Sequence, residues 1–246
     1  MAPVADSPAS FHPSKAAIIT GSRRAKVGSE MNMSRAYDKL MAMSASKSKS
    51  PSSLRLALAN RVVIADGAMG TMLQAANPSL EDFQGHEGCN EVLNITRPEL
   101  VEDIHRRYFS VGVDAVETNT FGANLANLGE YGISERIFEL AEAGARIARK
   151  AADSFSTPNA PRWVLGSLGP GTKLPTLGHA SYEELRSAYE TASQGLIEGG
   201  ADALLIETTQ DLLQAKAAVN GARAAMNRCE RDIVLIAQVT VETTGT

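Results

Sequence analysis

The stretch Ala203-Leu204-Leu205-Ile206-Glu207 decides the fold of this 246-residue chain. An unbroken apolar run of this length is typical of a strand that is buried on both faces, as in parallel sheets. The run ends in a carboxylate, and two threonines follow it. In parallel α/β folds the carboxyl ends of the strands form the rim at which ligands bind. The stretch therefore predicts a parallel strand with a charged group at its ligand-binding end.

Two earlier stretches have the same form. Residues 62–66 are apolar up to Asp66, and residues 113–117 end in Glu117. Small or hydroxyl-bearing residues follow each acid, as they follow Glu207. Three acids at the ends of different strands predict one polar pocket that suits a cationic group, such as a substrate ammonium.

Strand and helix patterns alternate from about residue 53 to the end of the chain. Apolar periodicity and capping residues predict strands at 61–66, 113–118, 163–167, 203–207 and 233–239, and helices at 97–111, 134–154, 181–198 and 211–227. Such alternation implies a parallel sheet covered by helices. An open doubly wound sheet and a closed barrel both fit this order.

Two features favour the barrel over the open sheet. Polar residues follow several different strands, and no glycine fingerprint for a dinucleotide follows the first strand. We therefore predict an α/β fold of the (β/α)8 TIM-barrel family, with only about the first five βα units present.

Composition excludes several classes of protein. A net charge of -4 and 43% hydrophobic residues are ordinary for a globular protein and give no reason to expect nucleic-acid binding. No apolar run approaches the roughly 18 residues of a membrane span. The cysteines, Cys89 and Cys229, lie far apart and outside any paired motif. We expect two free thiols in a reducing compartment, and hence a cytoplasmic protein with no membrane or nucleic-acid partner.

The head of the chain differs from the rest. Residues 1–52 lack sustained apolar periodicity, and residues 44–53 are mostly serine and lysine. Such a segment cannot bury enough apolar surface to offset its ordering entropy. We predict a disordered low-complexity tail over 1–52 and one domain over 53–246. An organelle transit peptide and an upstream start site remain open as interpretations of this head, because it is basic and holds several methionines.

The turn at residues 66–71 is the strongest local signal for a binding site. Its glycines allow the backbone to approach a ligand closely. Exposed amides in such a turn can hold a carboxylate, while the Asp66 carboxylate can accept from an ammonium. The turn would thus suit the head group of an amino acid, and the alternative is a plain structural turn. Its residues are Asp66, Gly67, Ala68, Met69, Gly70 and Thr71.

Two other segments carry polar groups after a strand. Residues 117–121 include Glu117 and Asn119, and the alternative to a ligand site there is an acid satisfied by neighbouring hydroxyls. Residues 207–211 close the fourth strand, and the alternative there is a helix cap formed by Asp211. The glycine-rich segment 166–173 does not fit a phosphate loop, because the order of its threonine and lysine is reversed. We expect it to form a turn at the pocket rim.

Taken as a set, four segments resemble the homocysteine-binding domain of cobalamin-dependent methionine synthase. They are residues 66–71, 117–121, 166–170 and 207–218, in the family's order and spacing, and the resemblance extends from about residue 54 to the end. It implies a (β/α)8 barrel that binds homocysteine at the carboxyl ends of its strands.

The resemblance also implies roles for the predicted site residues. By motif position, Asp66 and Glu207 would hold the substrate ammonium, and the amides of the 66–71 turn would hold its carboxylate. Glu117 and Asn119 would line the same pocket.

Cofactors and further domains are implied by the resemblance as well. The family uses a zinc ion, held by three cysteines, to keep the homocysteine sulfur as a thiolate that attacks methylcobalamin. Those cysteines follow strands six and eight, whereas this chain reaches about strand five at Thr246. We therefore expect the catalytic groups, the metal ligands, and the folate and cobalamin domains beyond Thr246. For this chain alone we expect no tight binding of zinc or methylcobalamin, no methyl transfer, and exposed sheet edges that favour association.

Two other functions stay open from the sequence. The chain could be a non-catalytic truncated remnant, or part of a cobalamin-independent homocysteine S-methyltransferase that uses a small sulfonium donor. A downstream Gly-Gly-Cys-Cys-Gly-Thr segment would favour the enzyme over the remnant.

Overall fold

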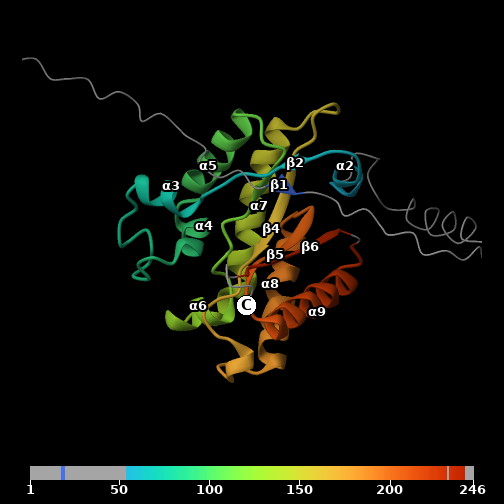
Figure 1. Cartoon of the computed structure of the whole chain (residues 1–246). Coiled ribbons are helices and arrows are strands. Elements are labelled where there is room, and N and C mark those ends of the chain that lie inside the picture. Colours follow the sequence, from blue (N-terminus) through green and yellow to red (C-terminus); the bar gives the residue numbers. More distant parts are fainter. Residues whose placement is uncertain (1–17, 20–53, 232, 242–246) are drawn as a thin grey trace, which may run out of the picture.

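A parallel sheet is the centre of the computed structural model, which describes residues 18–19, 54–231 and 233–241 (Figure 1). The sheet has the strand order β3–β4–β5–β6, formed by Ala115–Glu117, Trp163–Leu168, Ala203–Thr209 and Val234–Val239. Strand β2 (Val63–Ile64) continues it, because Ala65 forms a parallel bridge with Ala115. The strands thus follow one another in chain order, as the walls of a (β/α)8 barrel do.

Long helices connect the strands and lie side by side outside the sheet. They are α5 (Pro98–Ser110), α7 (Ile137–Phe155), α8 (Tyr182–Glu198) and α9 (Leu212–Arg228). Helix α5 packs on α7, α7 on α8, and α8 on α9 (Figure 1). The predicted alternation of strands and helices is confirmed.

Shorter elements fill the connections between the strands and the long helices. They are α2 (Leu54–Asn60), α3 (Gly70–Ala75), α4 (Leu93–Thr96), α6 (Leu125–Glu130) and the 3-10 turns η1 (Asn90–Val92), η2 (Ser134–Arg136) and η3 (Pro175–Leu177). Among the helices formed by the described residues, none is both long enough and apolar enough to cross a membrane.

Side-chain caps fix where α8 and α9 begin. The Ser181 hydroxyl accepts from the Glu184 N–H, and the Glu184 carboxylate accepts from the Ser181 N–H, which is a capping box. At α9 the Asp211 carboxylate accepts from the N–H groups of Leu213 and Gln214. Each cap satisfies backbone donors that would otherwise lack a partner, and contributes about 1 kcal/mol. The Asp211 cap is the one that the sequence analysis gave as the alternative to a ligand site at residues 207–211, and this cap forms in the structure.

The strands bury different side chains on their two faces, because successive residues alternate. Val116, Val164, Leu204 and Ile206 belong to the large cluster that packs against the helices. The opposite face forms an inner cluster, defined by Leu54, Val63, Ala65, Ala115, Trp163, Leu165, Ala203 and Leu205. Since Leu54 comes from α2, this helix covers the apolar inner face of the partial barrel.

Strand β1 (Ile18–Ile19) pairs antiparallel with β2, with Ile18 opposite Ile64 and Ile19 opposite Val63. It lies in the segment 1–52 for which we predicted a disordered tail, and the rest of that segment is outside the described residues. The edge of β2, which the sequence led us to expect unpaired, therefore has a partner at these two positions.

Candidate functional site

Asp66 links the first two strands of the barrel at their carboxyl ends. Its N–H donates to the Ala115 carbonyl (3.1 Å), and its Oδ1 accepts from the Glu117 N–H (2.8 Å). Asp66 is only 3% exposed. Its carboxyl group takes the place of a backbone carbonyl in the pairing between the two strands, because it accepts the Glu117 N–H. Only one of its oxygens is used in this way, and the other is left for further contacts.

Glu117, Ser167 and Glu207 lie on the same face of three successive strands, β3, β4 and β5. Each is the second residue after a member of the inner cluster, so all three share the inner face of the partial barrel. The Ser167 hydroxyl donates to Glu207 Oε1 at 2.5 Å. The sequence analysis did not select Ser167, although this period of two along the strand is a signal that would have found it.

Backbone geometry next to Glu207 is unusual. Thr208 has a φ of 57°, and the pairing of β5 with β6 changes register between Ile206 and Thr209. A positive φ is a genuine outlier for a β-branched residue, and such outliers are concentrated at functional sites. This bulge ends the regular part of β5 directly after the acid.

The structure brings the three strand-end acids together. Burial raises the pKa of Asp66 well above its usual range, and the charges of Glu117 and Glu207 add to this. Burial and the charge of Glu207 raise the pKa of Glu117 to about 8. Burial also raises the pKa of Glu207, whereas the Ser167 hydroxyl acts in the opposite direction. A cation among these carboxyls would relieve their repulsion and favour their ionised forms.

The turn at 66–71 places free backbone amides beside these acids. The Tyr108 hydroxyl donates to the Ala68 carbonyl (3.0 Å) and holds the turn against α5. Helix α3 begins at Gly70, and no side chain caps it. Within the described residues, the N–H groups of Met69, Gly70 and Thr71 have no acceptor. Adjacent N–H groups of this kind can bind a carboxylate.

Asn119 is turned toward the helical layer. Its Nδ2 donates to the Asn90 carbonyl (2.8 Å) and to Asn94 Oδ1 (2.9 Å), and its side chain is buried. These bonds hold the loop after β3 against η1 and α4. Only the Oδ1 of Asn119 is left for a ligand, so its place in the pocket wall stays a prediction.

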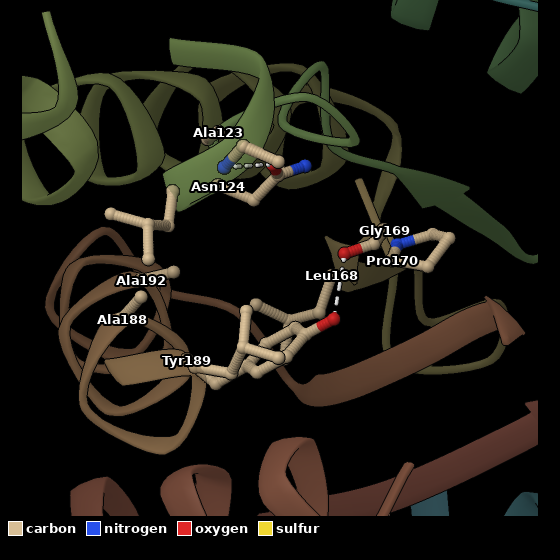
Figure 2. Close-up of a pocket in the computed structure, with 11 residues that line it drawn as sticks. Ala123, Asn124, Leu168, Gly169, Pro170, Ala188, Tyr189 and Ala192 are labelled. Atoms are coloured by element: carbon tan, nitrogen blue, oxygen red, sulfur yellow. Dashed lines mark hydrogen bonds between the residues drawn. The ribbon is translucent and has the colours of Figure 1, made fainter. Parts of the chain in front are cut away.

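A separate apolar pocket lies between α6, the end of β4 and α8, and Figure 2 shows its lining. Its cavity volume is only about 10 Å³, and none of the three acids lines it. The Tyr189 hydroxyl donates to the Gly169 carbonyl (3.1 Å), and the side-chain Oδ1 of Asn124 caps α6 by accepting from backbone N–H groups. Since these polar groups are already paired and the rest of the lining is apolar, this pocket is a packing gap.

The described residues do not fit the zinc site that the family resemblance implies. Within the described part of the chain, no three His, Cys, Asp or Glu side chains are arranged to hold a metal ion. The Cys89 thiol is buried beside Glu91, and burial raises its pKa to about 12, so it stays neutral. Cys229 lies at the end of α9, away from the strand-end acids.

Comparison with known proteins decides the family. A family model described as Homocysteine S-methyltransferase matches residues 63–246. The chain belongs to this family. The homocysteine S-methyltransferase assignment confirms the resemblance and the barrel class that the sequence predicted.

Two curated relatives of this chain are methionine synthases. The protein from Mycobacterium tuberculosis (strain ATCC 25618 / H37Rv) is 61% identical over 189 residues, and the one from Mycobacterium leprae (strain TN) is 59% identical over 189 residues. Each match covers 77% of this chain and 16% of the relative. The chain thus spans 16% of the length of the curated relatives that it matches.

A solved structure shares the fold. The homocysteine methyltransferase MmuM from Escherichia coli, in its metallated form, superposes with a TM-score of 0.61 at 22% sequence identity. The superposition covers 77% of this chain and 67% of that chain. At this identity the likeness establishes a common barrel architecture, of which this chain contains a part.

Proposed function

We propose that this chain forms the homocysteine-binding region of a methionine synthase. The observation that carries the proposal is the set of three strand-end carboxyl groups, Asp66, Glu117 and Glu207, gathered on the inner side of the barrel wall. Family membership and the methionine synthase relatives support homocysteine as the amino acid bound there.

The proposed binding mode separates the two ends of the substrate head group. Asp66 and Glu207 accept from the homocysteine ammonium, because a carboxylate paired with an ammonium forms a short, strong hydrogen bond. The free N–H groups of Met69, Gly70 and Thr71 donate to the substrate carboxylate. Glu117 forms the wall between the two acids. The role of this chain is therefore to bind and orient homocysteine.

Chemistry at the sulfur belongs to the whole enzyme that we propose. There, a zinc ion would hold the sulfur as a thiolate and methylcobalamin would supply the methyl group, with folate and cobalamin domains as partners. The cobalamin-independent alternative has weaker support, because the methionine synthases are 59–61% identical to this chain and the Escherichia coli methyltransferase is 22% identical.

A pair of ligands tests the proposed recognition of the ammonium. Calorimetric titration of the 246-residue chain would compare homocysteine with 4-sulfanylbutanoic acid, which has the same thiol and carboxylate but no amine. We expect homocysteine to bind at least about tenfold more tightly, since a charge-assisted hydrogen bond contributes roughly 1.5–3 kcal/mol. Equal affinities for the two ligands would contradict the proposal.

A further inference from the structure

Ser167 makes a directed contact with one of the strand-end acids. Its hydroxyl, which has a single proton, donates to Glu207 Oε1 at 2.5 Å. The side chain of Ser167 is 2% exposed, so water does not compete with this bond. A buried hydroxyl that donates to a carboxyl group favours the ionised form of that group.

The backbone of Ser167 is held by the loop after β3. Its N–H donates to Thr118 Oγ1 (2.9 Å), and its carbonyl accepts from Thr120 Oγ1 (2.8 Å). Because Thr120 has given its only proton to that carbonyl, Thr118 must be the donor in the 2.6 Å contact between the two threonine hydroxyls. These three bonds close a ring that fixes Ser167 and thereby aims its hydroxyl at Glu207.

Glu117 lacks an equivalent donor. Glu117 lies on β3, the neighbour of the strand that carries Ser167, and the charge of Glu207 raises its pKa. Within the described residues, no N–H or O–H group donates to the Glu117 carboxyl group. Of these two acids, Glu207 receives a donated side-chain hydrogen bond, from Ser167, and Glu117 receives none within the described residues.

We propose that Ser167 is a positioning residue, which makes Glu207 rather than Glu117 the ionised acid that meets the substrate ammonium. This inference rests on the proposed function, because it concerns the same pocket. Without the hydroxyl, Glu117 and Glu207 would compete for one proton on nearly equal terms, and part of the population would present a neutral Glu207 to the ligand.

The charged and titratable groups around Glu207 determine the pH dependence that follows. Asp66 lies after β2, Glu117 ends β3, and Tyr108 on α5 lies near Asp66 and Glu117. No cation is among these groups, and burial raises the pKa of each of the three acids. Raising the pH through these elevated pKa values ionises the acids and strengthens ammonium binding. Loss of the Ser167 hydroxyl should move this rise in affinity to higher pH.

Carboxyl titration in the absence of ligand is the first arm of the test. Carbon-13 NMR of the full 246-residue chain, labelled at glutamate Cδ, would follow Glu117 and Glu207 in the wild type and in Ser167→Ala. We expect the Glu207 midpoint to rise and the Glu117 midpoint to fall in the variant. Unchanged midpoints would overturn the proposal. Ser193→Ala is the matched control, because Ser193 is a buried serine whose hydroxyl has no partner within the described residues.

Homocysteine binding as a function of pH is the second arm. We expect Ser167→Ala to bind about tenfold more weakly than the wild type near neutral pH, and this deficit should shrink as the pH is raised and both glutamates ionise. Ser167→Thr, which keeps a hydroxyl, should restore the wild-type profile. A deficit of the same size at every pH would indicate a merely structural role and would overturn the proposal. Failure of the wild type to bind homocysteine would instead count against the proposed function, and the carboxyl titration would still decide the role of Ser167.

Discussion

Asp66, Glu117 and Glu207 are informative because burying a carboxyl group costs free energy unless something compensates. Asp66 receives the Glu117 N–H and Glu207 receives the Ser167 hydroxyl, yet burial and mutual repulsion still raise the pKa of all three acids. A fold that keeps such groups close together gains by binding a cation there.

The sequence could locate these acids but not their partners. Each acid ends an apolar strand, so the local pattern is enough to place it at the rim. The partners of Ser167 and Asn119 come from other strands and helices, and only the three-dimensional arrangement brings those together. The period of two along β4 could have placed Ser167 on the inner face, but it does not reveal which group its hydroxyl contacts.

His105 is expected to make the stability of the chain sensitive to acid. It is completely buried in α5, neither ring nitrogen has a partner within the described residues, and burial lowers its pKa to about 4. In the unfolded chain the His105 imidazole binds a proton near pH 6.5, whereas in the folded chain it does so only near pH 4. The buried neutral imidazole therefore makes its full contribution to the free energy of unfolding above about pH 6.5. This contribution is lost as the pH falls toward about 4, and the loss is about 2 kcal/mol at about pH 5.

Denaturant unfolding at about pH 7 and at about pH 5 checks this expectation. From about pH 7 to about pH 5, the free energy of unfolding should fall by about 2 kcal/mol less in His105→Leu than in the wild type. Exposed His179, changed to leucine in the same way, is the control for removal of an imidazole. The same loss in His105→Leu and in the wild type would show that the buried ring does not carry the effect.

At the scale of elements, the long helices and the strands were predictable because each has several turns or residues of consistent pattern. The short helices α2, α3, α4 and α6 were not predicted, since 4–7 residues are too few for a helical period to stand out. The pairing of β1 with β2 was not predicted either, because residues 18–19 and 63–64 are far apart in the sequence. Such contacts depend on the whole fold.

Glycines set the distance between the outer helices. A Cβ at Gly195 in α8 would lie 2.6 Å from the Phe138 carbonyl oxygen of α7, which is backbone and cannot turn aside. We expect Gly195→Ala to destabilise the chain by about 1–3 kcal/mol through overpacking, although alanine is the better helix former. The midpoint of urea unfolding measures the effect.

Gly129 in α6 offers the matched control for this substitution. A Cβ there would lie 3.2 Å from the Ser134 hydroxyl oxygen, which is the end of a small, rotatable side chain. Gly129→Ala should therefore leave stability nearly unchanged. If both alanine variants behaved alike, close packing of α7 on α8 would not be the reason for Gly195.

For the whole molecule, the order of strands and helices was enough to predict the barrel family, and the family match over residues 63–246 confirms it. The described strands form an open sheet and not a closed barrel, because β6 pairs only with β5 among the described residues. Val239 on β6 is 58% exposed, in line with the expected tendency of this sheet edge to associate. The pocket that we propose lies toward β2, β3, β4 and β5, where β3 pairs with β4, β4 pairs with β5, and Ala65 bridges to Ala115 of β3.

The central claim is that Asp66 and Glu207 hold the homocysteine ammonium, and one calorimetric titration tests it most directly. Homocysteine would be titrated into the wild type, Asp66→Asn and Glu207→Gln, with Glu135→Gln as an exposed-acid control. Each amide keeps one oxygen that can accept from the Glu117 N–H or the Ser167 hydroxyl, while the negative charge and the second acceptor oxygen are removed. We predict that each of the two site variants binds at least about tenfold more weakly, while the control binds as the wild type does. Equal affinity in the wild type and both site variants would contradict the account.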